Sequence, residues 1–358
     1  MRSRKVLKFN MFFAVHFPSW LKPEIIPGLP IRWYGLMYIF AFATAFIVYR
    51  KQIKERNFPM TDDSLTNMFS WGILFLIIGA RIFSTLIYET SNIYIKQPWL
   101  IFWPFRNGQF TGLQGMSYHG GAFGCLMAIV IYAKVKKINF REVGDMFAAS
   151  IPLGYTFGRL GNFINAELYG RVTASPLGII FPNAKMLPAK EEWVAEIAEK
   201  TNAAITQLNG IAYVNLPRHP SQLYEAIFEG VVLWALIWFF RKRKPFKGFL
   251  VGLYFLGYGF FRFIIEYFRE PDADIGYRLE FVKTSLPTAY AHPIFSFSTG
   301  QVLCFWMILF GIVWLFIASR LPNKEAVYIY TPEEKPLINK EDASKERNKR
   351  RKLRKKLK

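Results

Sequence analysis

The chain has 358 residues, of which 52% are apolar, 18% aromatic and only 20% charged, and its formal net charge is +21. The apolar residues gather in long blocks, which argues against the two soluble domains that a chain of this length would otherwise suggest. The positive charge is unevenly placed, because residues 345–358 contain ten Lys or Arg and one Glu and so supply nine of the 21 charges. A nucleic-acid-binding protein is therefore not expected.

Seven apolar segments are long enough, or nearly long enough, to cross a hydrocarbon layer of about 30 Å at about 1.5 Å per residue. In chain order they cover residues 34–48, 68–88, 120–133, 147–163, 223–240, 249–268 and 301–317. The third and fourth are short and rich in glycine. This pattern predicts an all-α, polytopic membrane protein with about seven transmembrane helices.

Lys and Arg cluster in the links after the first, third and fifth segments, around residues 50–56, 134–141 and 241–247. The positive-inside rule places these links in the cytoplasm. An odd number of helices then puts the N-terminus outside and the C-terminus inside, although Arg2, Arg4, Lys5 and Lys8 run against this orientation. We expect one membrane domain over residues 1–320, followed by a cytoplasmic tail over residues 321–358.

The long links lie on the opposite, outer side in this scheme. Apolar residues recur at roughly helical spacing over residues 191–208, within an outer-face insertion at about 183–217. They predict an amphipathic helix on the outer surface, bounded by Pro188 and by Asn209-Gly210.

Charged residues inside the sixth segment are the first sign of function. A charge at membrane depth costs about 2.5–3.5 kcal/mol on insertion scales and by default marks a functional interior. Tyr258, Arg262, Glu266 and Arg269 follow one another in steps of four, four and three, which places them on one helical face. A structural ion pair between helices is one interpretation. A phosphate-binding guanidinium held by a carboxylate fits better, because the planar fork matches phosphate oxygens.

The end of the fourth segment carries a denser group of polar residues. Arg159, Asn162, Asn165 and Glu167 occur within nine residues and are followed by Gly170. A guanidinium, two amides and a carboxylate so close together are hard to explain by packing. This group again favours binding of an anion.

Single polar residues open the first, third and fifth segments. Tyr34 belongs to an aromatic pair for which anchoring at the membrane interface is the ordinary explanation. His119 lies between glycines, where it serves either as a hydrogen-bonding residue or as a proton carrier, and residue chemistry leaves both open. Ser221 is a plausible N-cap of the fifth helix, with Glu225 one turn further on.

An excess of guanidinium groups within reach of the lipid phase indicates an anionic amphiphile, and phospholipid is the abundant one. The sequence contains no G-x-S-x-G elbow and no H-E-x-x-H zinc motif. We therefore expect a reaction without metal or cofactor, in which arginines stabilise a phosphate leaving group and a base activates a nucleophile.

Five motifs in a fixed order resemble one known family. They are I-R-W-Y-G-L-M-Y at 31–38, G-M-S-Y-H-G-G at 115–121, G-R-L-G-N-F-I-N-A-E-L-Y-G-R at 158–171, R-H-P-S-Q-L-Y-E at 218–225 and G-Y-G-F-F-R-F-I-I-E-Y-F-R-E-P-D at 257–272. In these motifs the chain is similar to the phosphatidylglycerol–prolipoprotein diacylglyceryl transferases, the bacterial enzymes that begin lipoprotein maturation.

The resemblance implies a seven-helix bundle in the bacterial inner membrane with a small periplasmic head. It also implies transfer of the diacylglyceryl group from phosphatidylglycerol to the lipobox cysteine thiol in the signal peptide of a preprolipoprotein. The products are then a thioether and glycerol phosphate.

The resemblance also assigns roles to residues at matching positions. It implies that Arg159 binds the phospholipid headgroup and that Arg262 is the essential arginine of the sixth helix. The other catalytic candidates are His119, Tyr258 and Glu266, and the other substrate-binding candidates are Tyr34, Asn162, Glu167, Gly170 and Arg269. Whether His119 is the base that takes the thiol proton or only positions the lipid stays open.

Two alternatives belong to other classes of protein. A transporter or flippase for an anionic amphiphile could use the same arginines without chemistry, but the sequence shows no internal repeat of the kind many transporters have. A non-catalytic membrane scaffold leaves the buried charges unexplained. The basic tail is expected to be disordered through self-repulsion and to contact anionic lipid headgroups.

Overall fold

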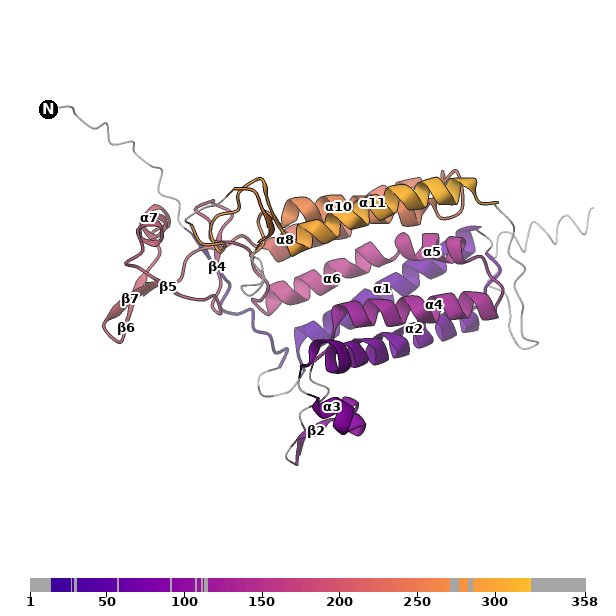
Figure 1. Ribbon diagram of the computed structural model, residues 1–358, viewed down its shortest axis with the longest axis horizontal. Coiled ribbons are helices and arrows are strands. Elements are labelled where there is room, and N and C mark those ends of the chain that lie inside the picture. Colours follow the sequence, from indigo (N-terminus) through magenta and orange to yellow (C-terminus); the bar gives the residue numbers. More distant parts are fainter. Residues whose placement is uncertain are drawn as a thin grey trace, which may run out of the picture. The chain divides into compact units, whose positions relative to one another are not determined.

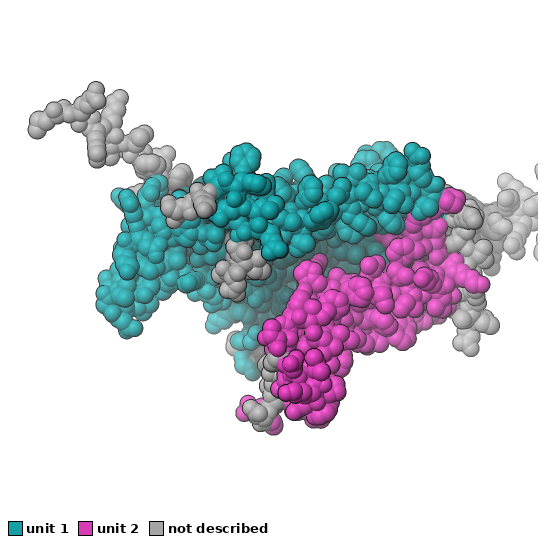
Figure 2. All heavy atoms as spheres, viewed as in Figure 1, with its two compact units in different colours: residues 1–45, 147–321 teal, residues 46–146, 322–358 magenta. Residues whose placement is uncertain are grey.

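A computed structural model describes residues 14–26, 28, 31–56, 58–90, 92–106, 108–110, 112, 115–270, 277–282 and 286–322. The chain divides into two compact units (Figure 2): residues 1–45 and 147–321 form unit 1, and residues 46–146 and 322–358 form unit 2. The N-terminal basic residues and nearly all of the predicted C-terminal tail lie outside the described residues.

Unit 1 is built on long apolar helices. They are α6 (Ile151–Ile164), the run of α8 (Ser221–Glu225), η3 (Ala226–Val232) and α9 (Leu233–Phe240), α10 (Phe249–Ile265) and α11 (Thr299–Arg320). Helices α10 and α11 lie side by side (Figure 1), because Gly259 of α10 leaves room for Ile308 and the backbone of α11. Leu233, Ile237 and Leu250 are buried together with Ala148 and Ala149 in one core cluster.

Small sheets and one short helix accompany these long helices in unit 1. Strand β1 (Val15–His16) pairs in parallel with β4 (Ile179–Ile180), and β8 (Tyr277–Glu280) pairs antiparallel with β9 (Ser296–Ser298). Strands β5 (Leu187–Pro188), β7 (Ile211–Val214) and β6 (Ile205–Leu208) form an antiparallel sheet in that order. Helix α7 (Glu192–Thr201) packs Val194 and Ile197 against Val214 and Leu216.

The predicted amphipathic helix is therefore present, but it is shorter than the predicted segment. It ends at Asn202, whose left-handed backbone (φ 51°) turns the chain out of the helix. The residues that follow form strand β6, which pairs with β7 in register from Ile205 opposite Val214 to Leu208 opposite Ile211. The sheets in both units are a correction to the all-α prediction, although the chain is mostly helical.

Unit 2 is organised around α2 (Asp62–Phe83), continued by the π-helix η1 (Ser84–Tyr88), and α4 (Tyr118–Val135). The two helices meet through Gly79, Gly120 and Gly124, where an added Cβ would overlap the backbone of the facing helix. Small residues of this kind allow close helix approach in membranes. The smaller elements are α3 (Ile93–Lys96), the 3₁₀ helix η2 (Pro98–Ile101), β2 (Phe105–Arg106) and β3 (Gln109–Phe110).

Two helices cross the boundary between the units along the chain. Helix α1 (Trp33–Arg56) begins in unit 1 and ends in unit 2, and α5 (Phe140–Ala148) begins in unit 2. The fourth predicted segment, 147–163, is thus not one helix, since α5 ends at Ala148 and α6 starts at Ile151. Pro152 in the first turn of α6 suits a helix start and not a helix interior.

Five described helical segments are long and apolar enough to cross a membrane: Trp33–Arg56, Asp62–Tyr88, Tyr118–Val135, Ser221–Phe240 and Thr299–Arg320. Helix α10 is apolar but shorter, with 17 residues. These segments support the predicted multi-pass membrane protein. The count of seven spans remains a prediction.

Candidate functional site

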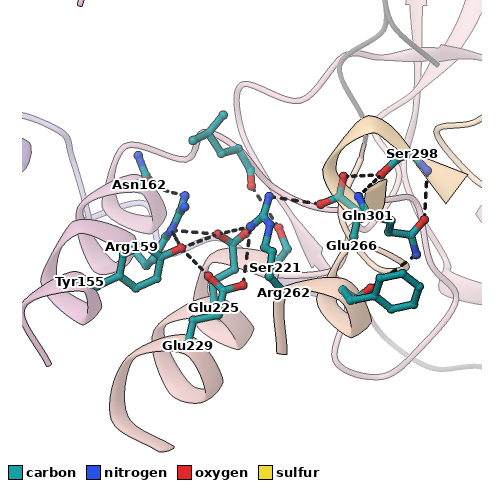
Figure 3. Close-up of polar contacts among 12 residues, drawn as sticks. Tyr155, Arg159, Asn162, Ser221, Glu225, Glu229, Arg262, Glu266, Ser298 and Gln301 are labelled. Atoms are coloured by element: carbon teal, nitrogen blue, oxygen red, sulfur yellow. Dashed lines mark hydrogen bonds and ion pairs between the residues drawn. The ribbon is translucent and has the colours of Figure 1, made fainter. Parts of the chain in front are cut away.

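The carboxylate of Glu225, at the end of α8, is the centre of a buried polar network in unit 1 (Figure 3). Its Oε2 atom lies 2.8 Å from Arg159 Nε and 2.8 Å from Arg262 Nη1. The Glu225 side chain is fully buried, and those of Arg159 and Arg262 are 17% and 11% exposed. One carboxylate therefore holds two guanidinium groups that come from two different helices.

Arg159 is held on α6 by its own helix neighbours. Its Nε donates to the Tyr155 hydroxyl at 2.5 Å, and its guanidinium lies 4.7 Å from the centre of the Tyr155 ring. Its Nη1 donates to Asn162 Oδ1 at 3.4 Å. Asn162 in turn donates to Glu167 Oε1 at 2.9 Å, and Asn165 donates to the same oxygen at 3.3 Å. The predicted group on the fourth segment is thus one connected chain of contacts.

Arg262 is held on α10 by a second carboxylate. Its Nη2 lies 3.2 Å from Glu266 Oε2, as the four-residue spacing predicts. Glu266 Oε1 accepts a hydrogen bond of 3.0 Å from Ser298, which caps α11 in a reciprocal capping box with Gln301. The absence of a side chain at Gly300 makes this approach possible, because a Cβ there would come within 2.7 Å of Glu266 Oε1.

Glu229 adds a third carboxylate from the π-helix η3. Its Oε2 accepts a 2.6 Å hydrogen bond from Tyr155, and its Oε1 lies 3.7 Å from Arg262 Nη1. The adjacent Gly230 faces α6 so closely that a Cβ there would overlap Thr156 Oγ1. Single π-helical turns occur frequently at functional sites, because they re-aim the side chains of an otherwise α-helical span.

Tyr258 and Tyr34, two of the predicted site residues, lie on different helices of unit 1. The Tyr258 ring meets the Tyr155 ring edge-on, with 5.9 Å between centres. Tyr34 packs against α6 at Gly161, where a Cβ would lie 3.2 Å from Tyr34 Cδ2, and its hydroxyl is 3.1 Å from that of Tyr38. Tyr258 therefore borders the arginine network through Tyr155, whereas Tyr34 contacts the helix that carries Arg159.

Gly170 and Arg269 meet through their backbones. They form an antiparallel bridge, beside which Arg171 N donates to Phe268 O and Gly170 N donates to His219 O, both at 2.8 Å. A Cβ at Gly170 would overlap the Phe268 carbonyl. The structure thus gives Gly170 a packing role at the junction of two loops.

Ser221 does not cap the fifth helix, contrary to the prediction. It is the first helical residue, and its hydroxyl donates to Leu168 O at 3.1 Å. The neighbouring His219 packs its ring edge-on against Phe268 at 5.1 Å, and its Nδ1 lies 3.2 Å from the Tyr224 hydroxyl. Burial of this ring lowers the pKa of His219 from 6.5 to about 4, so the imidazole is neutral near pH 7.

His119 belongs to unit 2, where it is exposed in the first turn of α4. Its Nδ1 lies 2.9 Å from the hydroxyl of Tyr88, the last residue of η1. The start of α4 is fixed by Ser117, which accepts from Gly120 N at 3.1 Å. Arg81 holds the preceding loop, since its Nη1 donates to Gly115 O at 3.2 Å.

The structure therefore joins Arg159, Asn162, Glu167, Arg262 and Glu266 in one network, with Tyr258 at its border. The network also contains residues that the sequence analysis did not select as site residues: Tyr155, Glu225, Glu229, Ser298 and Gln301. Spacing carried a signal for two of them. Tyr155 precedes Arg159 by four residues, and Glu229 follows Glu225 by four in an apolar segment. Two guanidiniums, with the three carboxylates of Glu225, Glu229 and Glu266 in contact with them, can bind a phosphate and exchange protons with it.

Comparison with known proteins agrees with this chemistry. Residues 23–317 match the family model described as prolipoprotein diacylglyceryl transferase. A phosphatidylglycerol–prolipoprotein diacylglyceryl transferase of Treponema denticola is 52% identical over 84% of this chain and 93% of its own. Proteins of the same name from Treponema pallidum and Borrelia garinii are 47% and 41% identical, over 88% and 87% of this chain and 98% and 95% of theirs. These matches confirm the predicted resemblance and transferase function: the chain belongs to the prolipoprotein diacylglyceryl transferase family.

Proposed function

We propose that this chain transfers the diacylglyceryl group of phosphatidylglycerol to the lipobox cysteine thiol of a preprolipoprotein. The observation that carries the proposal is the pair of guanidiniums, from Arg159 and Arg262, that share the buried Glu225 carboxylate. Such a pair can take up a lipid phosphate by exchanging carboxylate contacts for phosphate contacts. The fork of each guanidinium matches two phosphate oxygens.

The reaction follows from this placement. The thiol sulfur attacks the glyceryl carbon that bears the phosphate, so a carbon–sulfur bond forms while the carbon–oxygen bond breaks. The electron pair of the broken bond stays on the phosphate oxygen, and glycerol phosphate leaves. Arg159 and Arg262 stabilise the negative charge that develops on this phosphate oxygen. Stabilisation of transition-state charge by preorganised donors is usually the largest single contribution to catalysis. A base takes the thiol proton.

The other candidate residues support these two arginines. Glu266 orients Arg262, and Asn162 with Glu167 orients Arg159. Tyr258 and Tyr34 border the lipid site, and Gly170 and Arg269 hold the loops beside it. His119 is our candidate for the base, because its ring is exposed and its Nδ1 is held by Tyr88.

The membrane topology is part of the proposal. We place seven spans in a bacterial inner membrane, with α7 and the small sheets of unit 1 as a periplasmic head. The N-terminus is then periplasmic and the C-terminus cytoplasmic. Residues 1–320 form the membrane domain, and the basic residues of 321–358 contact anionic lipid headgroups.

A reconstituted assay tests the function. Purified protein in phosphatidylglycerol vesicles is given a lipobox peptide, and mass spectrometry follows the thioether product. We expect product from the cysteine peptide, none from the matched Cys→Ser peptide, and no requirement for added metal or nucleotide. Translocation of labelled lipid without any thioether product would instead support a transporter.

Variants test the role of the arginines in the same assay. Arg159→Ala and Arg262→Ala are each expected to abolish turnover while the protein still inserts and folds. Arg243→Ala is the matched control, since Arg243 is exposed and packs on Phe239 away from the network. Activity retained in both site variants would contradict stabilisation of the phosphate by these residues.

A further inference from the structure

The arginine network contains more carboxylates than guanidiniums. Contacts join two guanidiniums, those of Arg159 and Arg262, to three carboxylates, those of Glu225, Glu229 and Glu266. With every group ionised, these five side chains carry one net negative charge. A phospholipid phosphate would add a second negative charge at the same place, in surroundings that screen charge poorly.

The three carboxylates are not equally compensated. Glu225 accepts two guanidinium contacts at 2.8 Å. Glu266 has Arg262 at 3.2 Å and the Ser298 hydroxyl at 3.0 Å. Glu229 has one close donor, the Tyr155 hydroxyl at 2.6 Å, whereas Arg262 lies beyond hydrogen-bond distance at 3.7 Å. Each of the three has one buried oxygen without a hydrogen-bond partner among the described residues, but only Glu229 has no guanidinium nitrogen closer than 3.7 Å there. Glu229 is therefore the carboxylate for which ionisation is least favoured.

We infer that Glu229 binds a proton as the phosphate of an anionic phospholipid binds to Arg159 and Arg262, and so keeps the charge of the site in balance. This inference rests on the proposed function. In this role Glu229 is a positioning residue, because it acts through Tyr155 and Arg262. Its neutral form no longer competes with the phosphate for Arg262, and Tyr155 can still donate to it while accepting from Arg159.

The groups that face Glu229 come from every helix packed around it. Tyr155 and Arg159 belong to α6, Glu225 to α8, Arg262 to α10 and Cys304 to α11, and Glu266 is the C-cap of α10. Tyr258 of α10 contacts the Tyr155 ring, and Arg269 acts on Glu225. A bound phosphate is a further anion among them, and an added anion favours the protonated form of a carboxyl. Lipid binding and proton binding must then strengthen each other.

The inference predicts how lipid affinity depends on pH. Where Glu229 is ionised in the free protein and protonated in the complex, each lipid that binds takes up about one proton. The dissociation constant for the lipid then rises about tenfold for each pH unit in that range. Below that range Glu229 already holds its proton, and the affinity is independent of pH.

Calorimetry on the full chain in detergent micelles tests this without turnover. A short-chain phosphatidylglycerol is titrated, with no peptide present, in buffers that differ in ionisation enthalpy, because the slope against that enthalpy counts the protons exchanged. We expect proton uptake for the wild type near neutral pH. Titration of the matching short-chain diacylglycerol, which lacks the phosphate, should show none.

The variant Glu229→Gln carries a permanently neutral amide of nearly the same shape. We expect it to bind the lipid without proton uptake, and with an affinity that no longer falls as pH rises. Glu192→Gln, on the exposed face of α7, is the matched control and should retain the uptake. A wild type that takes up no proton across the neutral range would overturn the inference even if Glu229→Gln failed to fold. Uptake that persists in a folded Glu229→Gln protein would also overturn it.

The two proposals fail in different ways. Thioether formation with no proton uptake refutes the role of Glu229 and leaves the transferase function standing. Proton uptake on lipid binding with no thioether product refutes the proposed reaction and leaves the charge-balancing role of Glu229 standing.

Discussion

Removing the charge of Glu225 is the most informative single change in this protein. The variant Glu225→Gln keeps the shape of the side chain but takes away the carboxylate that Arg159 Nε and Arg262 Nη1 both contact at 2.8 Å. Arg262 retains Glu266 at 3.2 Å, whereas Arg159 retains, among the described residues, only the neutral Tyr155 hydroxyl and the Asn162 amide. The variant therefore leaves Arg159 as a buried cation without a directly contacting carboxylate.

The magnitude follows from this geometry. Removing one partner of a buried ion pair costs about 3–5 kcal/mol, mostly because the other charge stays buried without compensation. We expect Glu225→Gln to lower the free energy of unfolding by about that amount. The comparable change at exposed Glu192 on α7 should alter stability by at most about 0.5 kcal/mol.

Unfolding in mixed micelles of detergent and sodium dodecyl sulfate measures these differences, and a double-mutant cycle assigns them. Combining Glu225→Gln with Arg159→Gln should show a coupling of about 0.5–3 kcal/mol, as side chains in one network do. The cycle with Arg262→Gln should show a smaller coupling, because Glu266 still compensates Arg262. A Glu225→Gln protein as stable as the wild type, or two cycles without coupling, would refute the reasoning that one carboxylate holds both arginines.

Three further predictions concern groups around the network. Gly230→Ala should push η3 away from Thr156 and lower turnover by about a hundredfold, the size of effect expected for a 1 Å misplacement. Initial rates measure this loss. Gly72→Ala is the control, since a Cβ there lies at an ordinary contact distance of 3.7 Å from Cys125 Sγ. Ser298→Ala should remove the cap of α11 and one partner of Glu266, costing about 0.5–2 kcal/mol of stability, and Ser298→Thr should restore both. The pKa of His219 falls from 6.5 to about 4 on folding, so the unfolded chain binds more protons between these values and stability must drop as pH falls through them. Thermal unfolding midpoints measured between pH 6.5 and 4 should show this drop in the wild type and a smaller drop in His219→Gln. The same pH profile in both proteins would contradict the role of His219.

Residue spacing alone determined much of the site. Steps of three and four residues placed Arg262 with Glu266, and Arg159 with Asn162, on shared helical faces, and the structure has both contacts. Such contacts are local, because residues three and four apart on one helix are neighbours wherever the helix packs. The length of the apolar segments likewise predicted a multi-pass membrane protein, and the cost of charge inside them marked these residues as candidates for a functional site, without any knowledge of the fold.

Only the tertiary structure decided which helices share a charge. Glu225 contacts Arg159 of α6 and Arg262 of α10, and Tyr155 links Arg159 to Glu229 across the same helices. These contacts depend on the packing of α6 against η3 and on the π-helical turn that aims Glu229, which residue periodicity in a single segment does not encode. Gly170 is a similar case, since its need for space comes from a distant loop at Phe268. Local periodicity determines which face of a helix is polar, whereas packing between distant segments determines what that face meets.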